Sequence, residues 1–197
     1  MEMVVVVLIF VITMMATVNI FITTQRTQRK SAAMQKLQDD LRFVLNRIGN
    51  EARVDTIDYA QYDTINGAGL GAKVAGEDYL ALRDFEGKQV VITTNKAAAV
   101  VSGDLCKNGA ATCPPASDGT ASTSCVVIGI DGVCAAATSS NISLDTLKFF
   151  IVPNTSAGST TRQSAVRIVL DASSVIVGNS PTHVQMQTTI SSRQYLH

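Results

Sequence analysis

An uncharged run near the start of the chain constrains its fold more than any other feature. Positions 3 to 25 are 23 residues without a charged side chain, and most of them are Val, Ile, Met, Leu or Phe. A helix needs about 20 predominantly apolar residues to cross a bilayer, so residues 1–25 are long enough to form a membrane-spanning segment. A cleaved secretory signal is the alternative, but such a signal opens with a basic region and ends at a small-residue cleavage site. The only charge before this run is acidic, Glu2, and we expect a membrane span.

The helix should continue well beyond the apolar run. The chain has no glycine before Gly49 and no proline before Pro114, so nothing breaks a helix over the first 48 residues. We therefore expect one helix from about Glu2 to about Arg53, which would be about 78 Å long at 1.5 Å per residue.

The second half of this helix, residues 26–53, has a single apolar stripe. Apolar side chains recur there at intervals of three or four residues, which places them on one helix face. They are Met34, Leu37, Leu41, Val44 and Ile48. A striped helix packs on a domain, whereas the all-round apolar half must be buried in lipid or in other protein. A juxtamembrane coiled coil is the alternative for the stripe, although the seam is barely two heptads long.

The composition changes abruptly after residue 53. Residues 54–197 contain 12 of the 13 glycines, all four prolines and all four cysteines. Short β-rich runs separated by Gly, Asn, Ser and Pro are typical of an antiparallel sheet. These runs are Tyr79 to Phe85, Lys88 to Thr94, Ser124 to Ile130, Asp145 to Val152, Ala165 to Asp171 and His183 to Ser192. The sequence predicts an α+β fold, in which the long N-terminal helix packs on an antiparallel β-sheet head.

Residues 97–141 should form a long surface excursion of this head, because they are rich in Ala, Ser, Thr and Gly and carry few charges. Only Cys125 to Ile130 is strand-like within it. The excursion contains Cys106, Cys113, Cys125 and Cys134. Zinc ligands are usually paired two to four residues apart or accompanied by histidines, and neither condition is met. We expect disulfides and hence an oxidising compartment; four inert thiols in a reducing compartment are the alternative.

Four cysteines permit three pairings. We favour Cys106 with Cys113 and Cys125 with Cys134, because neighbours in the sequence close small loops.

No motif indicates an enzyme, a cofactor or a metal site. Gly67 to Ala72 matches the dinucleotide pattern by letter, but it lacks the strand before and the helix after that the pattern needs, so we expect a flexible loop. His183 and His197 belong to no Cys/His or Ser/His arrangement. Three residues of the excursion could supply oxygen ligands to calcium, but they do not occupy alternate positions of the sequence as the ligands of a calcium loop do. They are Asp104, Asn108 and Asp118.

Three segments resemble one protein family. The opening Met1-Glu2-Met3-Val4-Val5-Val6-Val7-Leu8-Ile9 looks like the N-terminus of type IV pilins, a family that includes minor pilins and the pseudopilins of type II secretion. Leu37 to Arg53 is similar to helices of larger minor pilins and J-type pseudopilins, and Gln187 to Arg193 is similar to the final strand of that subgroup. The resemblance implies a filament subunit with a long N-terminal helix and a β-rich head. It favours a minor pilin or pseudopilin over a repeating major subunit.

Glu2 stands where the family's glutamate stands. A carboxylate at the edge of an apolar run is costly to leave unpaired in hydrocarbon. In the family, this glutamate is thought to pair with the N-terminal amine of a neighbouring subunit, so the resemblance implies that Glu2 sets the stagger of assembly. A solvated carboxylate at the lipid headgroups is the alternative. The side chains expected in the filament core are Val4, Val7, Leu8, Val11 and Met15.

The resemblance also implies partners and a location. The partners are other pilin or pseudopilin subunits, the inner membrane before assembly, a prepilin peptidase and an assembly machinery. The subunit would be a single-pass inner-membrane protein first and part of an extracellular or periplasmic filament afterwards. The family's leader processing and N-terminal methylation are placed on no residue of this sequence. A single-pass, membrane-anchored extracytoplasmic binding or sensor domain is the competing class.

The charge of the chain is a cancellation between its two parts. Residues 1 to 53 carry 7 basic and 4 acidic side chains, net +3, and residues 54 to 197 carry 9 and 12, net −3. A chain without a basic tract lacks the usual footprint of a nucleic-acid binder, and we expect no nucleic-acid partner. The basic helix and the acidic head instead suggest complementary contacts between subunits.

Overall fold

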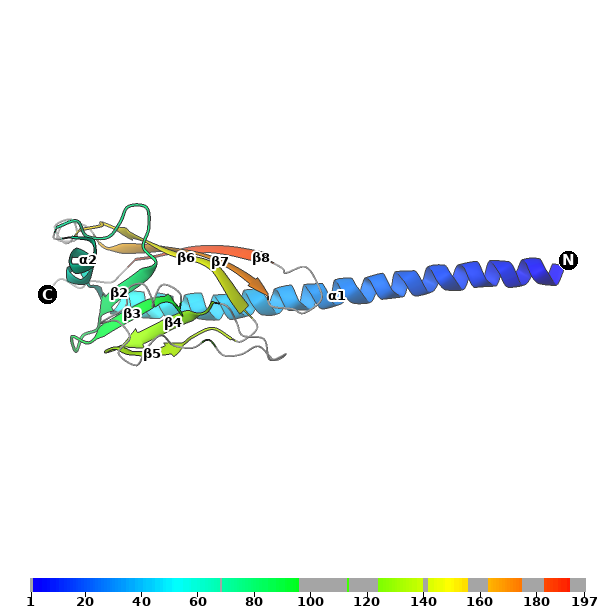
Figure 1. Ribbon diagram of the computed structural model, residues 1–197, viewed down its shortest axis with the longest axis horizontal. Coiled ribbons are helices and arrows are strands. Elements are labelled where there is room, and N and C mark those ends of the chain that lie inside the picture. Colours follow the sequence, from blue (N-terminus) through cyan, green and yellow to red (C-terminus); the bar gives the residue numbers. More distant parts are fainter. Residues whose placement is uncertain are drawn as a thin grey trace. The chain divides into compact units, whose positions relative to one another are not determined.

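The computed structural model describes residues 2–67, 69–95, 113, 124–139, 142–155, 163–174 and 183–191 (Figure 1). The chain divides into two compact units, Met1–Lys36 and Leu37–His197, which are considered separately below. The sequence-based boundaries, after residues 25 and 53, differ from this division. The reason is that residues from Leu37 onward bury side chains in the core of the head, whereas residues 3–32 are all exposed.

The long N-terminal helix is confirmed. Helix α1 comprises Glu2–Val54, 53 residues, and its end lies one residue beyond the predicted Arg53. Arg53 lies in the last turn, where a cation interacts favourably with the negative end of the helix dipole.

The first sheet is an antiparallel meander of five strands in the order β1-β2-β3-β4-β5. The strands are β1 Thr56–Ile57, β2 Tyr79–Arg83, β3 Gln89–Thr94, β4 Val126–Ile130 and β5 Val133–Ala136. Between β4 and β5 the chain reverses at Asp131 and Gly132, both with positive φ (51° and 83°). A two-residue Asp-Gly turn of this kind matches the right-handed twist of a hairpin.

The second sheet is antiparallel in the order β6-β7-β8, with β6 Ile142–Val152, β7 Ala165–Ser174 and β8 His183–Ser191. The register between β6 and β7 shifts between Leu144 and Thr146, which is a β-bulge at Asp145. The antiparallel pairing of the head is thus confirmed, but the strands form two sheets instead of one.

A short helix, α2 Tyr59–Asn66, lies between β1 and β2. Asp58 caps its N-terminus, because the Asp58 side chain accepts a hydrogen bond from the Gln61 backbone N–H. The sequence-based description missed α2, β1 and β5. Its strand-like segment inside the excursion corresponds to β4, and β5 follows it.

One hydrophobic core joins the second unit's part of α1 to both sheets. Leu37, Leu41, Val44 and Ile48 are at most 2% exposed within it. The fifth residue of the expected stripe, Met34, is 39% exposed and belongs to the other unit. The stripe also broadens, since two further apolar side chains of α1 are buried. These are Leu45 and Ala52.

Candidate assembly site

The first unit exposes a continuous apolar surface. Every described side chain from Met3 to Ile22 is exposed, although most are large and apolar. The expected filament-core residues share this exposure, from 44% at Val11 to 69% at Val4. The remaining three, Val7, Leu8 and Met15, are 60%, 58% and 65% exposed. This part of α1 is a candidate membrane span by length and hydropathy.

Threonine hydroxyls within and just after the apolar segment are hydrogen-bonded to the helix itself. Each donates to the carbonyl four residues earlier, as from Thr17 to Thr13 and from Thr24 to Ile20, both at 2.8 Å. The same bond is made by Thr13, Thr23 and Thr27. A polar group without a partner costs several kcal/mol in hydrocarbon. These bonds make the threonines compatible with lipid or with an apolar helix bundle.

Glu2 is the first residue of α1, and its side chain lies outside the described part of the structure. Its predicted pairing with a neighbouring subunit therefore stays a prediction.

A disulfide joins Cys113 to Cys125, with 5.7 Å between their Cα atoms. Neither pair that we favoured from the sequence is formed, because Cys113 and Cys125 are joined to each other and not to Cys106 and Cys134. Cys125 is held immediately before β4, and its sulfur packs in a small second core with Val127 and Cys134. Cys134 is also disulfide-bonded, and Cys106 lies outside the described residues. Cys134 lies in β5, and Cys125 immediately precedes β4 in the same five-stranded sheet.

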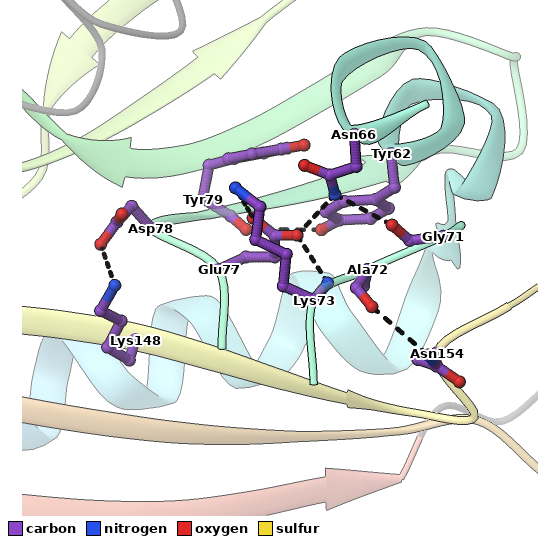
Figure 2. Close-up of polar contacts among 10 residues, drawn as sticks. All are labelled: Tyr62, Asn66, Gly71, Ala72, Lys73, Glu77, Asp78, Tyr79, Lys148 and Asn154. Carbon is purple, nitrogen blue, oxygen red and sulfur yellow. Dashed lines mark hydrogen bonds and ion pairs between the residues drawn. The ribbon is translucent and has the colours of Figure 1, made fainter. Parts of the chain in front are cut away.

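A buried carboxylate organises the segment between α2 and β2. Glu77 is 2% exposed, and its Oε1 atom accepts hydrogen bonds from Asn66 Nδ2 and from the Lys73 backbone N–H, both at 2.7 Å. Lys73 Nζ lies 3.9 Å from Oε2. Figure 2 shows the Glu77 carboxylate between these two residues. Because both close contacts come from the chain itself, this carboxylate has a structural role.

The segment Gly67 to Ala72 is a loop, as expected, and hydrogen bonds hold the part of it that the structure describes. The Gly71 N–H donates to Asp63 Oδ1 at 2.8 Å, and the Ala72 N–H donates to the Asn154 carbonyl at 2.8 Å. A Cβ on Gly71, whose φ is +62°, would lie 2.0 Å from that same carbonyl oxygen. Helix α2 precedes this segment and strand β2 follows it, the reverse of the order that a dinucleotide site needs.

One cluster of chemistry-bearing side chains was missed from the sequence. Asp145, Asp171 and His183 come from the three neighbouring strands β6, β7 and β8, and their ligand atoms lie within 4.8 Å of one another. His183 Nδ1 is 3.2 Å from Asp145 Oδ2. The bulge turns Asp145 to the outer face of the sheet, where strand alternation already places the other two. All three are at least partly exposed, and nothing else at this cluster points to a ligand.

Comparison with known proteins adds no relative. No family model, no curated protein and no solved structure matches the chain.

Proposed function

We propose that the protein is a structural subunit of a type IV pilus or pseudopilus filament and that it assembles through its N-terminal helix. The observation that carries the proposal is that one unbroken helix, Glu2–Val54, provides both an exposed apolar segment and a core element of the head. A membrane anchor alone does not require this, because a linker between span and domain would serve equally well.

The exposed apolar segment of α1 must be covered by another apolar environment. An all-round apolar helix is buried either in lipid or against other protein. In the proposal, lipid covers residues 3–22 before assembly, and the same segments of neighbouring subunits cover them in the filament. The internally bonded threonines suit both environments.

Glu2 is proposed to favour the filament over the membrane. A carboxylate next to a span of this hydropathy is costly in hydrocarbon, and an amine at the N-terminus of a neighbouring subunit would neutralise it. The heads face outward in this arrangement and stay in the oxidising compartment that the Cys113–Cys125 disulfide requires.

The test is the variant Glu2→Ala in the native host. We expect it to remain in the membrane fraction at the wild-type level and to be lost from sheared filaments. Asp39→Ala, an exposed acidic position farther along α1, is the matched control and should enter filaments normally. Normal incorporation of Glu2→Ala would overturn the role of Glu2. If the wild-type chain itself is absent from every filament and monomeric in detergent, it is instead an anchored binding or sensor domain.

A further inference from the structure

A groove lies between α1 and β8 in the second unit. Its volume is about 320 Å³, and its lining includes the apolar side chains of Leu45, Met186 and Ile190. The helix and strand are close here, since a Cβ on Gly49 would lie 3.2 Å from Ile190 Cδ1. Within the described residues β8 pairs only with β7, so the groove runs beside the edge of the three-stranded sheet.

Two arginines line this groove without an acidic partner. Arg42 and Arg53 are both exposed, and neither forms an ion pair with any residue that the structure describes. Arg47, on the same helix but outside the groove lining, is instead paired with Glu51 at 3.0 Å. The groove thus combines apolar side chains with two cations that no described carboxylate neutralises.

The turn between β2 and β3 has the complementary pattern. Phe85 is 88% exposed and stands between Asp84 and Glu86. Glu86 is ion-paired with Lys88 in the same turn, so residues 84–88 carry a net charge of −1. An exposed phenylalanine on an acidic turn matches an apolar groove with arginines beside it, because the ring is removed from water while the acidic turn faces cations.

The turn holds Phe85 in a defined position. Asp84 Oδ1 accepts from the backbone N–H groups of Glu86 and Lys88, at 2.8 and 2.9 Å, and the Gly87 N–H donates to the Asp84 carbonyl at 3.0 Å. Gly87 has a φ of +81°, which favours glycine at this place. A loop that is already ordered loses less conformational entropy when it binds.

We propose that the β2–β3 turn of one copy, with Phe85 at its centre, binds the α1–β8 groove of a second copy. The partner is a second copy because the two complementary surfaces lie on one chain but on different sheets, and Phe85 is exposed within its own copy. Two different patches make a heterologous contact, which extends into an open chain unless rotation closes a ring. The proposal rests on the filament function proposed above and names the contact that the heads add to it. It requires two copies to be neighbours in the filament, which a repeating subunit provides and the minor subunit favoured by the resemblance provides only where two copies are adjacent.

Photo-cross-linking in cells that produce the full chain tests the contact. Phe85 is replaced by the photoreactive analogue p-benzoylphenylalanine, and adducts are mapped by mass spectrometry. We expect adducts between two copies that map to α1 from Arg42 to Arg53 and to β8 from Met186 to Ile190. The same replacement at Val74, which is 82% exposed in another loop, is the control and should not give these adducts. Adducts that map elsewhere, adducts to a different protein, or none at all would overturn the proposal.

Charge reversal provides a second measurement. The groove variant Arg42→Glu/Arg53→Glu and the turn variant Glu86→Arg should each lower the yield of adducts about tenfold, and their combination should recover most of it. Arg47→Glu, outside the groove lining, should leave the yield within about twofold of the wild type. Equal losses in the combined and single variants would contradict the pairing.

The two proposals fail differently. A chain that enters filaments while its Phe85 adducts miss the groove overturns only the contact between heads. A chain that is absent from filaments overturns the filament function.

Discussion

Asn66 Nδ2 donates a hydrogen bond to Glu77 Oε1 at 2.7 Å, and this contact ties the end of α2 to the residue that precedes β2 by two positions. Asn66 also donates to the Gly71 carbonyl at 2.9 Å, so one side chain bonds both the middle of the intervening loop and Glu77 near its end. Glu77 in turn exchanges backbone hydrogen bonds with Phe149 of β6, at 2.8 and 2.9 Å. The loop that leads into β2 of the first sheet is thereby hydrogen-bonded to β6 of the second sheet.

Glu77→Ala should therefore destabilise the head. The change leaves the Lys73 N–H without its acceptor and removes one bond of Asn66, and an unsatisfied buried donor costs about 1–3 kcal/mol. Chemical denaturation of the full chain in detergent, followed by the near-ultraviolet circular dichroism of its tyrosines, measures the loss. Lys73→Met removes only the exposed ammonium, 3.9 Å away, and should change the unfolding free energy by less than about 1 kcal/mol. Equal effects of the two changes would contradict the structural role of Glu77.

Tyr62 and Tyr79 offer a matched pair of hydroxyl deletions. Their rings are stacked with centroids 5.1 Å apart, and burial raises the pKa of both hydroxyls, so both stay protonated. The Tyr62 hydroxyl accepts from the Ala81 N–H at 2.8 Å, whereas the buried Tyr79 hydroxyl has no hydrogen-bond partner among the described residues. Tyr62→Phe should cost about 1–3 kcal/mol, and Tyr79→Phe should be neutral or stabilising. The reverse order of the two unfolding midpoints would rule out this assignment.

The long helix and its buried face were predictable because both depend on local pattern. Helices need only an unbroken run without Gly or Pro, and a stripe at helical spacing identifies the face that packs. Leu37, Leu41, Val44 and Ile48 were found in this way. Met34 has the same spacing, but its exposure depends on where the head ends, which no local pattern contains.

The elements that were missed depend on longer-range contacts or on weaker signals. Helix α2 has only eight residues, and the signal that announces it is Asp58 with Gln61 three residues later, which is typical of a helix N-terminus. Strand β1 has two residues and exists through its pairing with β2. The cluster at Asp145 needs both a bulge and the register of three strands, and neither can be read from sequence spacing.

Asp55, just after α1, should make stability depend on pH. It is 4% exposed, and burial, followed by the charges of Glu51 and Asp84, raises its pKa from 3.8 to about 6. The folded state holds the Asp55 proton more tightly than the unfolded state does. The contribution of protonated Asp55 to the free energy of unfolding is therefore complete below pH 4 and is lost as the pH rises to about 6. Asp55→Asn should thus resemble the wild type at pH 4 and be more stable by about 1–3 kcal/mol at pH 7.

Denaturation at both pH values measures this difference, with the exposed Asp39→Asn as the control. A stabilisation by Asp55→Asn that is the same at pH 4 and pH 7 would show that the carboxylate charge is not its cause.

Peptide mapping without reduction should recover a linked pair containing Cys113 and Cys125. Closing a loop of about 15 residues stabilises a fold by about 3 kcal/mol in the chain-entropy description. The variant Cys113→Ser/Cys125→Ser should accordingly unfold at a lower denaturant concentration than the wild type. Recovery of Cys113 linked to Cys106 would contradict the structure.

Immunogold electron microscopy of filaments sheared from the native host tests the filament role most directly. With an antibody against the head, we predict label on the filaments and none in a strain that lacks the gene. Detergent extracts of the same cells provide the comparison, since they show how the unassembled chain behaves. A chain that is absent from every filament and monomeric in detergent would contradict the account.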